Sequence, residues 1–468
     1  MTDSSYDLVV LGGGSGGYAA ALRAAELGRT VAIVEQDLLG GTCLHRGCVP
    51  TKALLHTAEV ADGVRRAAAV GVNATLDGID LSASLAWREK LVQGKHRGLS
   101  SLVKARGITV VSGRGTLTSV DGRPAIDVSG DRLVGTDVVI ATGASSRTIP
   151  GIELGQKILD SESALALDEV PRRAVILGGG VIGVEFASAW RSLGAEVTIV
   201  EALDNLIANE DPSSRDALEK AYRRRGIALE LGARVTAAEQ SDDGVTVSID
   251  RDGEARTLDA DVVLVAVGRG PVTNGLGLAE AGIEIDRGFV SVDESLRTNA
   301  PHVWAVGDIV AGPQLAHRGF RHGIFVAETI AGENPSPLDD SLFPRVTYST
   351  PEVASVGSTE PQAIAAHGAD RIVTREVSLA GNAKSEIVSA GSESRAGFAK
   401  VVALADGPIL GVHLVGERVG ELITEGQLAV AWEARADDLA PLIHAHPSQS
   451  EALGEAFLAL AGSPLHTL

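Results

Sequence analysis

The stretch YDLVVLGGGSGGYAAALRAAELGRTVAIVE, residues 6–35, decides the fold, because it recurs as RRAVILGGGVIGVEFASAWRSLGAEVTIVE at residues 172–201. Each copy is an apolar run, a G-x-G-x-x-G turn, a helix of small residues and a second apolar run that ends in glutamate. The first glycine and the closing glutamate are equally far apart in both copies. The repeat therefore predicts two strand–turn–helix–strand units of the kind that bind dinucleotides.

The residue types in these turns suit a pyrophosphate. The first glycine allows the tight turn, the second lets the backbone approach the phosphates, and the third lets the helix pack on the strand. Ordinary glycine-rich turns are the alternative, but the closing acid in each copy favours a ribose ligand. The glycines are Gly12, Gly14 and Gly17 in the first copy and Gly178, Gly180 and Gly183 in the second, and the acids are Glu35 and Glu201.

The residues after the second copy bear on the choice of nucleotide. The chain continues as VEALDNLIANE, with no Arg or Lys between Glu201 and Glu210. A 2′-phosphate would meet a carboxylate and no cation there, so the second site is expected to prefer NAD over NADP.

Both cysteines of the chain, Cys43 and Cys48, lie in GGTCLHRGCVPTK, residues 40–52. A disulfide that closes so short a loop would stabilise the folded chain only weakly. A structural zinc site would need further ligands, which this stretch lacks. A redox-active pair and a pair of small buried core residues both remain open from the spacing.

Composition narrows the class of protein. The chain has 468 residues, 44% of them hydrophobic, so several domains are expected. A net charge of -20 argues against nucleic acid and anionic membrane surfaces as partners. No basic residue precedes Arg23, so no targeting signal is expected, and no apolar stretch is long enough to span a membrane. We expect a cytoplasmic protein, where a stable disulfide would be unusual and a catalytic one would not.

Taken in order, these features resemble the flavin-dependent pyridine nucleotide–disulfide oxidoreductases over essentially the whole chain. The stretch 40–52, Glu201 and the ending HAHPSQSEA, residues 444–452, are most similar to the members that oxidise dihydrolipoamide. Two departures stand out. His45-Arg46 replaces the commoner Asn-Val, at positions expected on the surface side of the helix, and Ser448-Gln449 replaces Thr-Leu.

The resemblance implies an α/β protein with two Rossmann-like three-layer domains that carry antiparallel insertions, plus a C-terminal α+β dimerisation domain. Runs such as TLTSVDGRPAIDV, residues 116–128, read as the insertions, and the pattern between residues 52 and 107 is helical. The expected domains are 1–148 (FAD-binding, first part), 149–271 (NAD-binding), 272–341 (FAD-binding, central part) and 342–468 (interface).

The resemblance also implies the cofactors, a tightly but non-covalently bound FAD and NAD, and no metal. The FAD site would use Gly12, Gly14, Gly17, Glu35, Lys52, Gly115, Thr142, Gly143, Asp308 and Ala316. The NAD site would use Gly178, Gly180, Gly183, Glu185, Glu201 and Gly268. Lys52 and Glu185 would pair near the reactive flavin nitrogen; a solvated lysine and a glutamate near a helix N-terminus are the alternatives.

Four residues are the catalytic candidates by the same resemblance. Cys43 and Cys48 would form the redox disulfide, with Cys43 the exchange thiol and Cys48 the thiol beside the flavin. His446 would be the base, and Glu451 would orient its ring. Residues 448–451 also read S-x-x-E, so Glu451 has a second interpretation as part of a helix-capping box.

The implied activity is oxidation of protein-bound dihydrolipoamide with reduction of NAD. The implied partners are lipoyl domains of 2-oxoacid dehydrogenase acyltransferases or the glycine cleavage carrier protein, and a second copy of the chain in a homodimer with composite sites. An NAD(P)H-dependent reductase of another small disulfide or of a quinone is the alternative, and an assembly protein that docks to a large complex is a third.

Overall fold

The structure is a computed structural model and describes residues 3–392 and 397–467. The chain forms two compact units, each built from three separate segments. The first unit contains residues 1–50, 86–147 and 269–340, and the second contains residues 51–85, 148–268 and 341–468. Residues 51–85, expected in the first FAD-binding part, group with the second unit, which also contains both the expected NAD-binding and interface segments.

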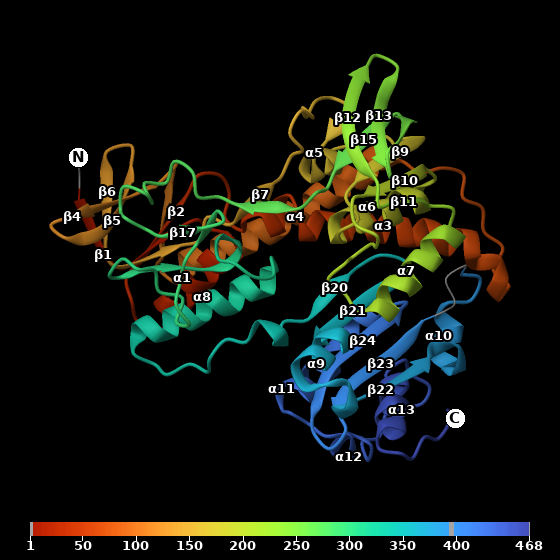
Figure 1. Ribbon diagram of the computed structural model, residues 1–468. Helices are drawn as coiled ribbons and strands as arrows, with labels where there is room; N and C mark the ends of the chain where they lie inside the picture. The colour runs from red at the N-terminus through yellow and green to blue at the C-terminus, as the bar shows by residue number, and fades with distance from the viewer. Residues whose placement is uncertain (1–2, 393–396, 468) are drawn as a thin grey trace. The chain divides into compact units, whose positions relative to one another are not determined.

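The first unit is built on a seven-stranded sheet (Figure 1). Its parallel part runs β3 (Thr109–Ser112), β2 (Val31–Glu35), β1 (Asp3–Leu11), β6 (Asp131–Ile140) and β19 (Val303–Ala305). Strands β4 (Thr116–Val120) and β5 (Arg123–Val128) extend it antiparallel. The apolar runs form central strands because both faces are covered, as Leu8, Val9 and Val10 show with no exposed surface.

Two helices lie together on this sheet, α1 (Ser15–Glu26) and α8 (Ala316–Ala331), as Figure 1 shows. Their backbones approach closely because glycines face each other. A Cβ at Gly319 would lie 3.2 Å from the Gly16 nitrogen, and a Cβ at Gly323 would collide with the Gly16 carbonyl oxygen. The small-residue helix of the first repeat thus serves helix–helix packing as well as the turn.

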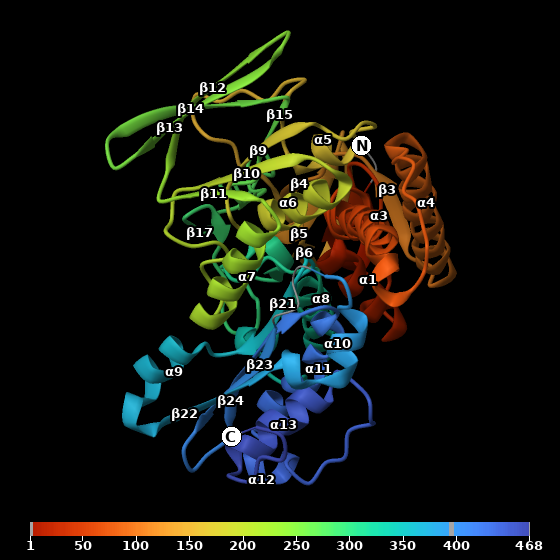
Figure 2. The same ribbon diagram turned by 90° about the vertical axis from the view of Figure 1, so that its right-hand side faces the viewer.

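The second unit carries the second repeat in a five-stranded parallel sheet. Its order is β11 (Ala228–Leu231), β10 (Glu196–Glu201), β9 (Arg173–Leu177), β15 (Val262–Val265) and β8 (Ile158–Leu159), with α6 (Val181–Leu193) after the turn. A three-stranded antiparallel sheet, β12 (Arg234–Ser241), β13 (Gly244–Arg251) and β14 (Glu254–Ala260), extends from it, as Figure 2 shows. Both antiparallel insertions expected from the sequence are present.

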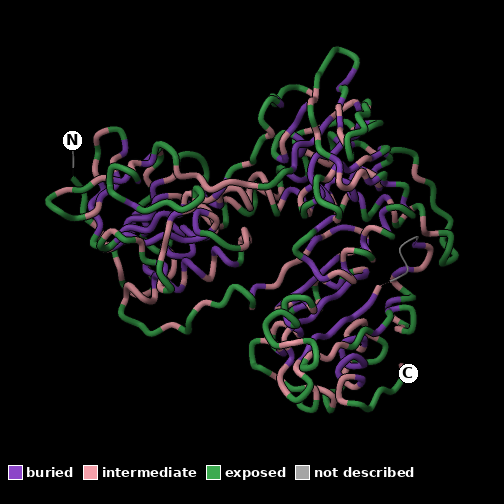
Figure 3. The backbone as a smooth tube through the Cα atoms, viewed as in Figure 1, coloured by how far each residue is buried: buried purple, intermediate pink, exposed green. Residues whose placement is uncertain are grey.

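The C-terminal part of the second unit is a five-stranded antiparallel sheet with helices. Its order is β20 (Arg345–Thr347), β21 (Glu352–Gly357), β24 (Ile409–Gly416), β23 (Phe398–Leu404) and β22 (Ile372–Ser378). The helices include α9 (Glu360–His367), α11 (Ile423–Ala431) and α13 (Glu451–Leu460). In Figure 3 the central strands β21, β24 and β23 are largely buried, whereas the outer strand β22 is mostly not.

Residues 52–107 are largely helical as expected, with α3 (Cys48–Arg66) and α4 (Leu81–Ala105). The predicted fold class, two dinucleotide-binding α/β domains with antiparallel insertions and a C-terminal α+β domain, is confirmed. Within residues 3–392 and 397–467, every helix is too short or too polar to cross a membrane.

Candidate functional site

The first glycine turn joins β1 to α1 and leaves room for a ligand. Gly12 has a φ of +104°, and a Cβ there would lie 2.5 Å from the Ala141 carbonyl oxygen. A Cβ at Gly17 would collide with the Gly12 carbonyl oxygen. A Cβ at Gly14 would instead meet only Gly41 Cα, at 3.9 Å. The outer two glycines are therefore required by close packing, and the middle one borders open space where phosphates fit.

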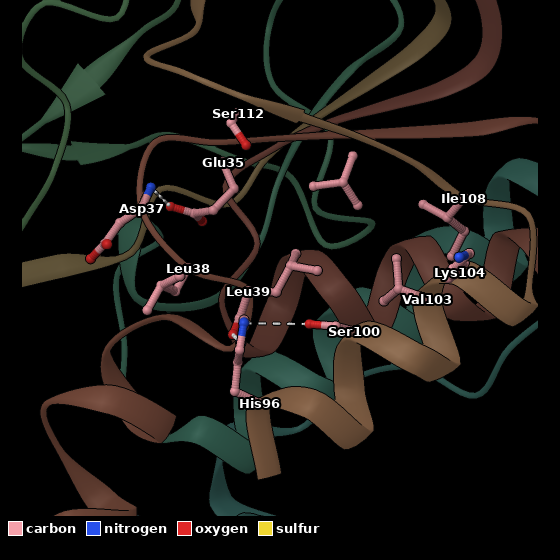
Figure 4. A pocket seen from close by; sticks show the side chains of 11 residues that line it. Glu35, Asp37, Leu38, Leu39, His96, Ser100, Val103, Lys104, Ile108 and Ser112 are labelled. Atoms are coloured by element: carbon pink, nitrogen blue, oxygen red, sulfur yellow. Dashed lines mark hydrogen bonds between the residues drawn. The ribbon is translucent and has the colours of Figure 1, made fainter. Parts of the chain in front are cut away.

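Glu35 ends β2 beside this turn and is fixed by backbone donors. Its Oε2 accepts a hydrogen bond from the Gly13 N–H at 2.7 Å, and its Oε1 accepts one from the Asp37 N–H at 2.8 Å. The side chain lines a cavity of about 390 Å³ together with Asp37, Leu39 and His96 (Figure 4). A carboxylate held beside such a cavity suits ribose hydroxyls, so these residues fit the adenosine end of FAD.

The second turn, between β9 and α6, repeats this geometry. Gly178 has a φ of +112°, and no atom lies within 4 Å of a Cβ built on Gly180. Glu201 accepts hydrogen bonds from the Gly179 N–H at 2.6 Å and the Leu203 N–H at 2.8 Å. A Cβ at Gly183 would collide with the Gly178 carbonyl oxygen. The second site thus has the same phosphate opening and the same oriented carboxylate as the first.

The sequence interpretation missed the central glycine of each GGG run. A Cβ at Gly13 would lie 2.7 Å from Leu39 Cδ2, and a Cβ at Gly179 would lie 2.6 Å from Leu206 Cδ2. Both N–H groups also bind the acid that closes the repeat. The repeated GGG in both copies could have indicated that the central glycine is also required.

Three further FAD candidates lie in the first unit near the ends of its strands. A Cβ at Gly115 would lie 2.6 Å from Ile126 Cγ2, so this glycine is explained by packing. The Thr142 hydroxyl donates to the Val272 carbonyl oxygen at 2.8 Å, and Gly143 has a φ of +69°. Gly115 and Thr142 therefore both make contacts within the protein itself.

Asp308 lies within a short 3-10 turn, Gly307–Ile309, in the first unit. Gly268 follows β15 in the second unit. Burial raises the pKa of Asp308, while Arg269 and Arg318 oppose the rise. Ala316 is the first residue of α8. Gly268 has a φ of +103° with open space where a Cβ would stand.

The cysteines lie on either side of a short break between two helices. Cys43 is within α2 (Gly41–His45) and is half-buried, and Cys48 opens α3 and is exposed. His45 and Arg46 differ from the surface positions expected, because both are half-buried and held in place. His45 Nε2 lies 2.9 Å from the Leu39 carbonyl oxygen, and Arg46 forms an ion pair with Asp37.

Tyr18 of α1 is a neighbour of this loop that the sequence did not single out. Burial and, to a smaller extent, the charge on Cys43 together raise the pKa of Tyr18 to about 12. The phenol therefore stays protonated close to Cys43, and only the fold brings the two residues together.

Lys52 and Glu185 form an ion pair inside the second unit. Lys52 Nζ lies 2.8 Å from Glu185 Oε1 and 2.7 Å from Oε2. The Glu185 side chain is only 4% exposed. Tyr348 holds both partners, because its N–H donates to Glu185 Oε1 at 2.9 Å and its ring centroid lies 4.7 Å from Lys52 Nζ. Sequence gave no signal for Tyr348, which lies far along the chain.

His446 and Glu451 are joined by a hydrogen bond of 2.8 Å between Nδ1 and Oε1. Glu451 Oε2 also accepts the Ser448 N–H at 2.7 Å. The Ser448 N–H, then His446, lowers the pKa of Glu451. Because an ionised carboxylate only accepts, Nδ1 carries a proton and the neutral ring has its free lone pair on Nε2.

Glu451 therefore satisfies part of both interpretations of the S-x-x-E stretch. It holds the imidazole, and it also reaches back to a backbone N–H as the acid of a capping box does. The helix starts later than a box at Ser448 requires, since α13 begins at Glu451 with Ser450 as N-cap and no side-chain cap. His444, the other imidazole nearby, contacts Glu425 at 2.7 Å instead.

Comparison with known proteins places these features in a family. Residues 6–323 match the model described as pyridine nucleotide-disulphide oxidoreductase, and residues 343–457 match its dimerisation domain. Dihydrolipoyl dehydrogenase of Bacillus subtilis is 38% identical, with 99% of each chain covered. Dihydrolipoyl dehydrogenase 3 of Pseudomonas putida is 39% identical, with 98% of each chain covered.

Solved structures agree with these matches. LpdA from Mycobacterium tuberculosis has a TM-score of 0.89 at 28% identity and covers 98% of this chain and 100% of its own. The HOCl-induced flavoprotein disulfide reductase RclA from Escherichia coli has a TM-score of 0.85 at 28% identity, with 97% and 99% covered.

Proposed function

Because this chain belongs to the pyridine nucleotide–disulphide oxidoreductase family, we propose that it oxidises protein-bound dihydrolipoamide to lipoamide and reduces NAD to NADH. The enzyme is an oxidoreductase whose cofactors are FAD and NAD. One observation carries the choice of a dithiol substrate: an imidazole whose Nδ1 is bound to Glu451 while Nε2 is left to take a proton, in a chain with a single pair of cysteines.

His446 is the base that prepares the substrate. A thiol is mostly protonated at neutral pH and attacks a disulfide only as the thiolate. His446 Nε2 takes the proton from one thiol of dihydrolipoamide, and Glu451 stabilises the imidazolium that forms. General-base catalysis of this kind contributes about 10²- to 10⁴-fold.

The two cysteines then exchange bonds with the substrate. The substrate thiolate attacks the Cys43 sulfur, a mixed disulfide forms, and Cys48 leaves as a thiolate. The second substrate thiol displaces Cys43, so lipoamide leaves oxidised and both cysteines are reduced. Bound FAD supplies a two-electron relay from the cysteines to NAD. Lys52, held by Glu185 and Tyr348, presents a fixed positive charge in the second unit.

The remaining assignments belong to this proposal. FAD binds at the first glycine turn and NAD at the second, with the predicted residues except Gly115 and Thr142, whose contacts are within the protein. The functional division is 1–148, 149–271, 272–341 and 342–468, with the last part forming a homodimer interface. The partners are lipoyl domains of 2-oxoacid dehydrogenase acyltransferases or the glycine cleavage carrier protein, in the cytoplasm.

The alternative is reduction of another small disulfide or of a quinone. This alternative is supported by the similarity to the flavoprotein disulfide reductase RclA, at 28% identity over nearly the whole chain. It differs from the main proposal in the substrate that reaches the cysteines.

A comparison of substrates tests the proposal. The purified holoenzyme is assayed with dihydrolipoamide and NAD, and with NADH against lipoamide, glutathione disulfide, coenzyme A disulfide and a quinone. We expect lipoamide turnover to exceed that of the other disulfides by orders of magnitude. Cys48→Ser and His446→Gln should lose lipoamide turnover and keep NADH-dependent quinone reduction. Equal or faster turnover of another disulfide would contradict the proposal.

A further inference from the structure

Two histidines of the first unit converge on one backbone oxygen. His45 Nε2 lies 2.9 Å from the Leu39 carbonyl oxygen, and His96 Nδ1 lies 3.0 Å from the same atom. The rings meet edge to face with centroids 5.2 Å apart. A carbonyl oxygen only accepts hydrogen bonds, so each of these nitrogens carries a proton. One acceptor thus receives an N–H from α2 and another from α4.

The second nitrogen of His96 supports this assignment. Its Nε2 lies 3.5 Å from the Ser100 hydroxyl one turn later in α4, as Figure 4 shows. With the proton on Nδ1, Nε2 of the neutral ring accepts from that hydroxyl. Leu39 itself is only 7% exposed, and its carbonyl oxygen accepts both N–H donors.

Leu39 precedes the point where the cysteine loop meets the first glycine turn. The next residues, Gly40 and Gly41, have φ values of +108° and +58°. The Gly40 N–H donates to the Gly13 carbonyl oxygen at 2.9 Å, and a Cβ at Gly41 would lie 2.7 Å from Gly14 Cα. The same loop then begins α2, which contains Cys43. Fixing Leu39 therefore fixes α2 relative to the turn.

We propose that His45 and His96 are positioning residues that hold the Leu39 carbonyl and so keep the redox cysteine loop and the FAD-binding glycine turn in one geometry. Nothing in their contacts calls for a direct role in the chemistry. The inference rests on the FAD site and redox pair of the proposed function, and not on which dithiol is oxidised.

Amide side chains provide matched variants. The glutamine amide nitrogen falls near the position of a histidine Nε2, and the asparagine amide nitrogen falls near that of Nδ1. His45→Gln and His96→Asn therefore keep the donor to Leu39, while His45→Asn and His96→Gln misplace it. All four substitutions are polar and uncharged, so the pairs differ in where the N–H stands.

The experiment uses the holoenzyme and two readouts. One is the rate of FAD release in sub-denaturing urea, followed by the rise in flavin fluorescence. The other is the long-wavelength absorbance shoulder that develops on two-electron reduction. We expect His45→Asn and His96→Gln to release FAD about 3- to 10-fold faster, the effect of one lost hydrogen bond, and to weaken the shoulder. His45→Gln and His96→Asn should stay within about twofold of the parent.

The double variant His45→Asn/His96→Gln should accelerate release by a factor that differs from the product of the two single effects, because both donors share one acceptor. The inference is overturned if the misplaced-donor variants release FAD at the parent rate with a full shoulder. It is equally overturned if the two variants at each position behave alike. Neither readout needs lipoamide, so failure of the proposed substrate would leave this test intact.

Discussion

At the scale of single residues, Glu451 shows how one carboxylate directs an imidazole. Its two oxygens bind His446 Nδ1 and the Ser448 N–H, so the ring has one orientation and one tautomer. The His446 side chain is otherwise 76% exposed, so little else restrains it.

Glu451→Ala is expected to lower kcat for lipoamide by about 10- to 100-fold, because the base loses both its orientation and the charge that stabilises the imidazolium. Steady-state kinetics with dihydrolipoamide and NAD measure this. NADH-dependent quinone reduction in the same variant is the control and should not change. A kcat within twofold of the parent would show that Glu451 serves the helix start alone.

Glu352 gives a prediction about pH. It lies on β21, and its Oε2 accepts the Gly420 N–H at 2.8 Å. Burial raises the pKa of Glu352 from 4.5 to about 7. Between these values the folded chain holds a proton that the unfolded chain has lost, so this group costs stability as pH rises toward 7.

Glu352→Gln keeps the acceptor and removes the charge. Relative to the parent, its free energy of unfolding should therefore improve by about 2 kcal/mol between about pH 5 and pH 8. Melting temperatures of the two holoenzymes at both pH values measure this. Glu433→Gln, at an exposed glutamate, is the control and should show no pH-dependent gain. If the stability of Glu352→Gln and of the parent changed with pH in the same way, the raised pKa of Glu352 would be refuted.

At the scale of elements, Asp211 joins three pieces of the second unit. It is fully buried and caps α7 (Pro212–Arg224) by accepting the Ser213 N–H at 3.1 Å. It also binds Lys400 of β23 at 2.8 Å and the Glu360 N–H at the start of α9 at 3.0 Å. Burial opposes ionisation, but Lys400 and the Glu360 N–H outweigh it and lower the pKa of Asp211.

Asp211→Asn should cost about 2–3 kcal/mol, because it leaves the buried Lys400 ammonium with a single carboxylate, Glu360, whose side chain is 36% exposed. The shift in melting temperature measures this. Glu360→Gln removes the charge of that exposed partner and should cost no more than about 1 kcal/mol. Equal losses in the two variants would mean that Asp211 is not the centre of this network.

At the scale of the whole molecule, the proposed catalytic residues are divided between the two units of the chain. Cys43 and Cys48 belong to the first unit, and His446 belongs to the second. The dimerisation domain covers residues 343–457, which includes His446. For the proposed homodimer we predict a composite site, with cysteines from one subunit and His446 from the other.

Hybrid dimers test this arrangement. His446→Gln and Cys48→Ser homodimers should both lack lipoamide turnover. A hybrid that pairs one subunit of each kind, isolated with two affinity tags, would have one intact composite site and about half of the parent activity. If each chain built its own site, the hybrid would be as inactive as the two homodimers.

Much of this protein is determined by local sequence. Two G-x-G-x-x-G repeats between apolar runs require strand–turn–helix units, because only glycine meets the backbone approaches found at Gly12 and Gly17. The spacing to Glu35 and Glu201 sets the carboxylates beside those turns. These features rest on short-range geometry, and the family prediction built on them is confirmed by the match over residues 6–323.

Only the tertiary structure decided which distant residues share a partner. Tyr348 meets Lys52 and Glu185, His96 meets His45 at Leu39, and Lys400 meets Asp211, although no motif links them in sequence. The His45 position expected at the surface became a packed contact for the same reason. Periodicity reports which face of an element is buried, but the partner across that face depends on how separate elements pack together.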